Sequence, residues 1–303
     1  MERRLEDAAV SLAAAKRAEA ERGGRSSRPP LPMAHNGAVY LSSARRRATA
    51  AASDTFPWTV PVIATLDRLE FTTPVTFFVG ENGSGKSTVL EGIAAGVRAI
   101  AVGSTDLDKD ASLHGAREFA AGFRFERRRQ ARTKLFFRAE DVFGFTRRML
   151  HTMDDLSAME EEFRRAFPEG SYGQQLAMGA ARGQRRALEG RYGENPDARS
   201  HGEVFLGLLA SRLVPGGLYL LDEPEAPLSP RGILQLIALV KDRVAKDCQF
   251  VIATHSPMLM AFPESTIYVF SGDAVTATPY DEVEHVQLTK SFLDNPQRFL
   301  RHF

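Results

Sequence analysis

The chain has 303 residues, of which 43% are hydrophobic and 25% are charged. This is the balance of a globular protein with a substantial core, and it excludes disorder as the dominant state. Lys and Arg total 39 against 38 for Asp and Glu, a formal net charge of +1, so the whole chain carries no large field that would attract nucleic acid or anionic lipid. The single cysteine, Cys248, excludes an internal disulfide and a cysteine-based zinc cluster.

No stretch has the roughly 18 uninterrupted apolar residues that are needed to cross a bilayer. The richest stretch, residues 204–221, is interrupted by Arg212, Pro215 and two glycines. The alanine-rich N-terminus is preceded and interrupted by charged residues, so it lacks the apolar block of a secretion signal. We therefore expect a cytoplasmic protein with no integral membrane segment.

The chain begins with a segment of low apolar content. Residues 1–36 mix Ala, Arg and Glu and end in a Gly-, Ser- and Pro-rich stretch. They can bury too little apolar surface to offset the conformational entropy that is lost when a segment becomes ordered. They are predicted to be a disordered or frayed helical extension, or an extension upstream of the true start. Residues 37–101 then form the first half of an α/β core, with strands expected at 38–41, 69–71 and 75–79 and a helix whose apolar face runs from Val89 to Ile100.

The second half of the core is predicted at residues 200–303. Apolar strands at 218–221, 250–253 and 266–270 alternate with helical patterns, the last a closing helix at 288–293. Continuous apolar strands that alternate with helices indicate a split, mostly parallel sheet with helices on both faces. Residues 102–199 between the halves are predicted to be an inserted, largely helical subdomain, too short and irregular for long coiled-coil arms.

A glycine-rich loop follows the strand at 75–79. Gly80 and Gly85, four residues apart and followed by Lys86 and Ser87, satisfy the phosphate-loop pattern G-x-x-x-x-G-K-[ST]. Glycines let successive amides point at phosphate oxygens, and the next helix adds its positive N-terminal dipole. Lys86 should contact the β and γ phosphates, and the Ser87 hydroxyl should bind Mg²⁺. The predicted nucleotide-binding residues are Gly80, Glu81, Asn82, Gly83, Ser84, Gly85, Lys86, Ser87 and Thr88.

Two carboxylates follow the strand at 218–221. Asp222 is the candidate for the Mg²⁺ shell, and Glu223 could orient or deprotonate the water that attacks the γ-phosphate. Alone, the Asp-Glu-Pro sequence would be an ordinary turn. The next strand ends at His255, which in isolation would be a histidine satisfied by backbone groups. Because the carboxyl ends of parallel strands share one edge of a sheet, Lys86, Asp222 and His255 are predicted to meet there.

With these residues, the chain resembles the ATP-binding-cassette (ABC) class of P-loop ATPases, most closely the soluble bacterial AAA-family ATPases, over residues 38–303. The resemblance implies ATP and Mg²⁺ as cofactors, Glu223 as the catalytic glutamate and His255 as the switch histidine. It places residues 225–230 at the loop through which the subunits of this class communicate.

The same resemblance implies a homodimer with two nucleotides between the subunits. The transporter signature is replaced by Ser200, His201, Gly202 and Glu203, so Ser200, Gly202 and Glu203 are predicted to approach the nucleotide. The alternative is that Ser200 and Glu203 form only a helix-capping box. Glu140 is predicted to take the place of the Mg²⁺-sensing glutamine of the class.

Two features stay open. Tyr40, Phe56 and Trp58 precede the glycine loop, and each is either the adenine-stacking residue or an ordinary core or turn aromatic. A basic cluster within the insertion is either a solvated face or a nucleic-acid contact. Its members are Arg124, Arg127, Arg128, Arg129, Arg132, Lys134 and Arg138.

The expected function is ATP hydrolysis that opens and closes a dimer and drives a conformational change in a partner protein or on nucleic acid. One alternative is an ATP-dependent interaction switch with negligible turnover. A second is the energising subunit of a membrane transporter, against which the altered signature weighs. A P-loop kinase for small molecules fits the carboxylate pair and the histidine less well.

Overall fold

The computed structural model describes residues 39–48, 54–102, 114–192 and 201–301. The described residues fall into two compact units, a larger one that ends at Pro279 and a smaller one that begins at Tyr280. The predicted N-terminal extension, residues 1–36, lies outside the described residues. The predicted second half of the core, 200–303, is therefore divided between the units at position 280.

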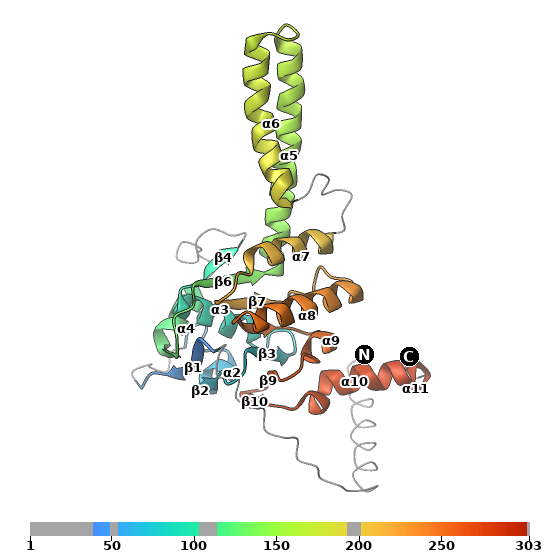
Figure 1. Cartoon of the computed structure of the whole chain (residues 1–303). Helices are drawn as coiled ribbons and strands as arrows, with labels where there is room; N and C mark the ends of the chain where they lie inside the picture. Colours follow the sequence, from blue (N-terminus) through green and yellow to red (C-terminus); the bar gives the residue numbers. More distant parts are fainter. Residues whose placement is uncertain (1–38, 49–53, 103–113, 193–200, 302–303) are drawn as a thin grey trace, which may run out of the picture. The chain divides into compact units, whose positions relative to one another are not determined.

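A seven-stranded sheet forms the centre of the larger unit (Figure 1). Its strands pair in parallel except β10, which is antiparallel to β9. This confirms the mostly parallel sheet predicted from the apolar strands. In spatial order the strands are β10 (Ala274–Ala277), β9 (Thr266–Ser271), β3 (Val75–Gly80), β8 (Gln249–Ala253), β7 (Gly217–Asp222), β6 (Thr133–Arg138) and β4 (Ile100–Val102).

A second, three-stranded sheet was not predicted as a sheet. Strand β1 (Leu41–Arg46) lies between β2 (Arg68–Glu70) and β5 (Phe123–Arg127), antiparallel to both. The strand expected at 38–41 is shifted, since β1 begins at Leu41. Strand β5 comes from the stretch that was predicted to be helical, and its pairing with β1 joins residues about 80 positions apart.

Helices cover both faces of the large sheet. Helix α3 (Lys86–Val97) packs against β3, β6, β7 and β8, while α7 (His201–Arg212) and α8 (Pro230–Ala245) pack together on the other side (Figure 1). Successive side chains of a strand point to opposite faces. Leu218 and Leu220 accordingly join the core beneath α3, whereas the Tyr219 ring between them packs with Phe250.

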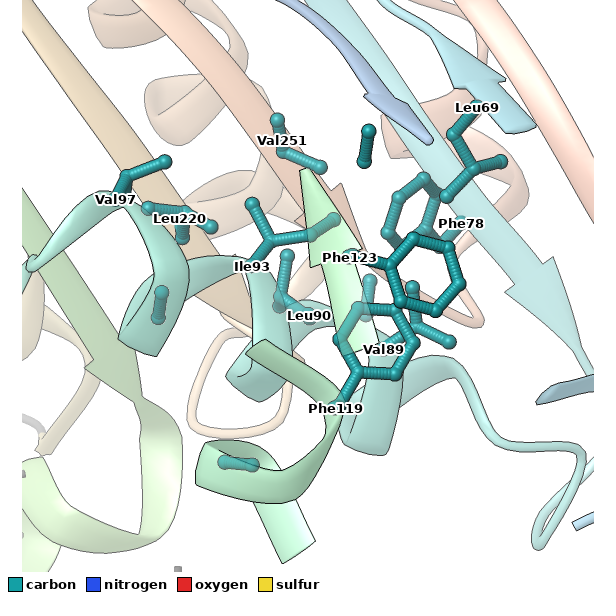
Figure 2. Close-up of a cluster of buried hydrophobic side chains, with 14 of the residues drawn as sticks. Leu69, Phe78, Val89, Leu90, Ile93, Val97, Phe119, Phe123, Leu220 and Val251 are labelled. Atoms are coloured by element: carbon teal, nitrogen blue, oxygen red, sulfur yellow. The ribbon is translucent and has the colours of Figure 1, made fainter. Parts of the chain in front are cut away.

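The core lies between α3 and the two sheets (Figure 2). Val89, Leu90, Ile93 and Val97 of α3 are fully buried, as their helical spacing predicts. The continuation of that face to Ile100 is wrong: α3 ends with Arg98 in the left-handed conformation, and Ile100 begins strand β4 with 65% of its surface exposed. The partners of α3 in this core are Leu69, Phe78, Phe119, Phe123, Leu220 and Val251.

Only part of residues 102–199 is a helical insertion. Helix α4 (His114–Gly122), β5 and β6 belong to the body of the larger unit, and the insertion is the antiparallel pair of α5 (Ala139–Ala166) and α6 (Tyr172–Tyr192) (Figure 1). These helices have 28 and 21 residues, longer than the irregular sequence led us to expect.

An ion-paired carboxylate joins the two helices of this hairpin. Glu160 is 6% exposed and accepts hydrogen bonds from Nε of Arg185 (2.9 Å) and Nε of Arg182 (3.2 Å). Burial alone would raise the pKa of Glu160, but these two guanidinium groups hold it below its ordinary value. The pairing fixes α6 against α5.

Short helices complete each unit. The larger unit also contains α2 (Pro61–Thr65) and α9 (Pro257–Met260). The described part of the smaller unit has a 3₁₀ turn, η3 (Tyr280–Glu282), followed by α10 (Glu284–Asp294) and α11 (Pro296–Leu300). Helix α10 confirms the predicted closing helix. Within the described residues, no helix is long and apolar enough to cross a membrane.

Candidate functional site

The glycine-rich loop joins β3 to α3, in the predicted order of strand, loop and helix. A Cβ atom at Gly80 would lie 2.4 Å from the Phe270 carbonyl oxygen, so this position admits no side chain without a backbone shift. Gly85 has φ 94°, which favours glycine, and a Cβ there would lie 2.8 Å from Cγ1 of Val62. Packing and backbone conformation therefore both require the two motif glycines.

Lys86 is folded into this loop. It is 4% exposed, and its Nζ donates hydrogen bonds to the carbonyl oxygens of Gly80 (2.8 Å) and Glu81 (2.7 Å). Burial lowers the pKa of Lys86, and the nearby carboxylates of Glu223 and Asp222 oppose that shift. The Ser84 hydroxyl in the same loop is buried and has no hydrogen-bond partner among the described residues. The loop thus holds a cation and an unused donor, which suits a bound anion.

Ser87 and Asp222 join the start of α3 to the end of β7. The Ser87 hydroxyl donates a 3.0 Å hydrogen bond to Oδ1 of Asp222. Burial raises the pKa of Asp222 to about 6, an effect that the Ser87 hydrogen bond opposes and the charge of Glu91 reinforces. A proton at this carboxyl is therefore easier to gain than usual.

This pair fits a magnesium ion that is shared with a nucleotide. Mg²⁺ is commonly bound by one or two carboxylates together with substrate phosphates. The described residues contain no group of three or more His, Cys, Asp or Glu side chains that could hold a metal. Asp222 and Ser87 could provide one carboxylate and one hydroxyl to such an ion, and phosphate oxygens and water would supply the rest.

Glu223 and His255 lie side by side. Oε1 of Glu223 is 3.4 Å from Nε2 of His255. Glu223 has φ 46°, and its backbone N–H donates to the carbonyl oxygen of Ala253 at the end of β8 (2.9 Å). Its side chain is 45% exposed, so water can reach the carboxylate.

The strand register explains why these residues converge. Strands β3, β8 and β7 are neighbours, and Ala253 at the end of β8 is in register with Phe78 of β3 and Asp222 of β7. The glycine loop, the two carboxylates and the histidine leave these strands at the same carboxyl edge. The structure thus brings together the side chains that the sequence predicted to meet.

Glu225 has a role that the sequence did not reveal. Its Oε1 accepts hydrogen bonds from the Thr254 hydroxyl (2.6 Å) and from the backbone N–H groups of His255 (2.7 Å) and Ser256 (3.2 Å). Burial raises its pKa. In the sequence, Glu225 is marked only by its place directly after Asp-Glu-Pro. Its contact with the loop that carries His255 depends on the pairing of β7 with β8, which the sequence does not show.

Glu140 is not joined to this group. It is exposed in the first turn of α5, and no hydrogen bond or ion pair links it to Ser87 or Asp222 in the part of the chain that the structure describes. The residue opposite Asp222 on β6 is Arg138, which forms an ion pair with Glu91 of α3. Arg138 was interpreted only as part of the basic cluster.

The signature segment is described in part. Ser200 lies outside the described residues, so its predicted contact with nucleotide stays a prediction. Gly202, in the first turn of α7, packs against the loop after Glu223: a Cβ there would lie 2.9 Å from the carbonyl oxygen of Pro227. Glu203 is exposed on the same helix.

The three upstream aromatic residues occupy different environments. The Tyr40 hydroxyl donates to Asp247 (2.9 Å), which precedes β8 and so lies at the opposite end of that strand from His255. Trp58 is buried and stacks against Phe119 and Phe123. Tyr40 and Trp58 are thus core residues. Phe56 is 53% exposed.

Four members of the basic cluster have partners within the fold. Arg127 and Lys134 donate to the carbonyl oxygens of Gly96 (3.2 Å) and Val97 (2.5 Å) at the end of α3, where cations complement the helix dipole. Arg129 pairs with Asp247 (2.6 Å) and Arg138 with Glu91. Arg127 and Arg129 are nevertheless exposed, as are the remaining members Arg124, Arg128 and Arg132.

Two family models match the chain, one on each half of this site. A model described as "AAA domain" matches residues 64–165, which contain the glycine loop. A model described as "AAA domain, putative AbiEii toxin, Type IV TA system" matches residues 204–261, which contain Asp222, Glu223 and His255. Both models describe AAA domains, and together they cover the glycine loop and the two carboxylates.

Solved structures that are similar to this chain include cbiO1 from Clostridium perfringens, part of the ABC transporter complex cbiONQ. It is 16% identical with a TM-score of 0.39, and the alignment covers 86% of this chain and 98% of that one. The Smc head domain from Pyrococcus furiosus, solved with an extended coiled coil and bound to the C-terminal domain of ScpA, is 13% identical with a TM-score of 0.41, covering 85% and 99%. No curated protein matches the chain.

Proposed function

We propose that this protein binds Mg-ATP and hydrolyses its β–γ phosphoanhydride bond. The observation that carries the proposal is the convergence of Lys86, Ser87, Asp222, Glu223 and His255 at the carboxyl edge of β3, β7 and β8. Phosphoryl transfer needs positioning and electrostatic stabilisation more than covalent help from the protein. This set of side chains supplies both.

The loop residues bind the phosphates. Amides of the segment Gly80–Thr88 and the positive end of α3 attract the phosphate oxygens, and the Lys86 ammonium exchanges its two carbonyl partners for the β and γ phosphates. The buried Ser84 hydroxyl gains an acceptor. Ser87 and Asp222 would hold the magnesium ion, whose chemistry is to neutralise charge on the phosphates.

Glu223 and His255 act at the γ-phosphate. The exposed carboxylate of Glu223 orients the attacking water and accepts its proton as a general base. His255, 3.4 Å from that carboxylate, donates a hydrogen bond to the γ-phosphate and so distinguishes ATP from ADP. The proximity of these two side chains supports a shared task at one phosphate group.

Two copies are proposed to enclose two nucleotides head to tail. In this arrangement the segment around Ser200, Gly202 and Glu203 of one copy covers the ATP that is bound by the other. A helix N-terminus with a glycine can approach phosphate closely, and Gly202 lies in the first turn of α7. Cycles of binding and hydrolysis would then open and close the dimer and act on a protein or nucleic-acid partner.

Two further uses of the same site are an ATP-dependent interaction switch with negligible turnover and the energising subunit of a transporter. Steady-state phosphate release separates the first from an ATPase. Co-purification with a membrane protein would support the second. Phosphate release measured with and without duplex DNA, single-stranded DNA and RNA, over a range of salt, tests for a nucleic-acid partner, because phosphate contacts are strongly salt-dependent.

The central test is calorimetry with Mg-ATP. The parent protein should bind it, and Lys86→Ala should lose most of the affinity because the loop then lacks its phosphate-binding cation. Equal affinity of the two proteins, or no heat from the parent, would remove the basis of the proposal. Lys241→Ala, an exposed lysine of α8, serves as the control.

A further inference from the structure

We infer that Glu225 is a positioning residue: its carboxylate fixes the loop that carries His255 and so sets how His255 meets the γ-phosphate. The inference rests on the proposed function. Glu225 lies beyond the end of β7, two residues after Glu223, whereas its partners lie at the end of β8. The contact joins the segment after the catalytic carboxylate to the histidine loop.

Three donors converge on one oxygen of Glu225. Oε1 accepts from the Thr254 hydroxyl at 2.6 Å and from the N–H groups of His255 at 2.7 Å and Ser256 at 3.2 Å. Thr254 is fully buried, so water cannot readily replace the carboxylate there. The backbone on both sides of the His255 side chain is thus held by this one group.

The N–H groups of Ser256 and His255 depend on Glu225 to different extents. The Ser256 N–H has a second acceptor in the Thr254 hydroxyl (3.0 Å), and the Ser256 side chain caps α9 by accepting from the N–H of Leu259 (3.3 Å). Glu225 Oε1 is the acceptor for the His255 N–H. Without it, that N–H would lose this hydrogen bond, and such a loss is costly where water is excluded.

The second carboxylate oxygen of Glu225 is not satisfied by the surrounding residues. Oε2 of Glu225 is buried and has no hydrogen-bond partner among the described residues. A buried carboxylate with one oxygen unsatisfied is costly. Among the described residues, the Glu225 side chain accepts hydrogen bonds from the histidine loop through Oε1, so holding that loop is the role that these contacts support.

Three variants test the role. Glu225→Ala removes the acceptor and should lower kcat roughly 10- to 100-fold, since small misplacements of catalytic groups have effects of that order. ADP affinity should stay within about twofold, while the preference for ATP over ADP falls. Glu225→Gln keeps an oxygen acceptor of the same reach and should retain most of the parental kcat. Glu118→Ala, an exposed glutamate of α4, is the matched control.

A double-mutant cycle separates positioning from a purely structural effect. If Glu225 acts through His255, then Glu225→Ala combined with His255→Ala should have the kcat of His255→Ala alone. Losses that multiply, or a Glu225→Ala protein with parental kcat and parental ATP preference, would overturn the inference. If Glu225→Ala does not fold, Glu225→Asp replaces it; its shorter side chain should give an intermediate kcat, and a parental kcat would count against the inference. A parent protein that binds no Mg-ATP would instead refute the proposed function.

Discussion

The Ser87 hydroxyl donates a 3.0 Å hydrogen bond to Oδ1 of Asp222. This contact joins the first turn of α3 to the last residue of β7, residues 135 positions apart in the chain. It brings a hydroxyl from the glycine loop and a carboxylate from the second half of the core to one point, where both can hold the same metal ion.

The buried charge of Asp222 predicts a pH-dependent stability. The pKa of Asp222 is about 6 in the folded protein against about 3.9 in an unfolded chain, so its ionised form is disfavoured by folding. The protein should therefore lose stability as pH rises through the window from about 4 to 6. Without nucleotide and magnesium, Asp222→Asn should raise the Tm by about 2–5 °C at pH 8, and the gain should shrink towards pH 4.

Thermal unfolding in the presence of a chelator measures this effect. Asp273→Asn removes an exposed carboxylate from the same unit and should leave the Tm nearly unchanged. An Asp222→Asn protein that is less stable than the parent at pH 8 would contradict the expectation. The same variant should lose magnesium-dependent nucleotide affinity, so stability and function should change in opposite directions.

Glu223→Gln should separate binding from turnover. The amide keeps the shape of the side chain but cannot accept the proton of water, so ATP affinity should stay near the parental value while the rate of phosphate release falls by roughly 10²–10⁴-fold. ATP should then accumulate on the protein and favour the enclosed dimer. Light scattering with Mg-ATP measures the dimer, and phosphate release at the parental rate would exclude Glu223 as the base.

Gly202→Ala should disturb the loop after Glu223. The added Cβ would meet the Pro227 carbonyl oxygen at 2.9 Å, and a backbone atom can yield only if the loop or α7 moves. We expect lower ATPase activity with nucleotide affinity within about threefold of the parent. Gly179→Ala is the control, because a Cβ on that helical glycine meets nothing within 4 Å. Unchanged activity of the Gly202 variant would show that the loop tolerates the shift.

Leu220→Ala should destabilise the larger unit. Leu220 is fully buried beneath α3, and truncation of such a leucine costs about 2–5 kcal/mol. Leu234→Ala removes a leucine of α8 that is 57% exposed and should cost no more than about 0.5 kcal/mol. Denaturant unfolding compares the two, and equal losses would argue against the described core.

The parts of the site that could be predicted from sequence are those encoded locally. The glycine loop lies between an apolar strand and a helix within about 25 residues, and Asp222 and His255 each follow an apolar strand. Parallel pairing then places them at one edge. The chemical roles proposed for the glycine loop, Asp222 and His255 rest both on the sequence motif and on this placement at one edge of the sheet.

Features that depend on pairing between distant segments were missed. The small sheet joins β1 to β5 across about 80 residues, and neither strand shows that partner in its own sequence. Glu225 reaches the histidine loop only because β7 and β8 are neighbours. Ile100 continues the apolar spacing of α3, yet the helix has already ended at Val97, and hydrophobic periodicity alone cannot show such an end.

The helical hairpin begins at the edge of the candidate site. Strand β6 ends at Arg138, opposite Asp222, and α5 starts at the next residue. With 28 residues, α5 is about 42 Å long. A rotation of about 10° at its first turn would sweep the far end through about 7 Å, so a small rearrangement beside Asp222 would be amplified along the hairpin.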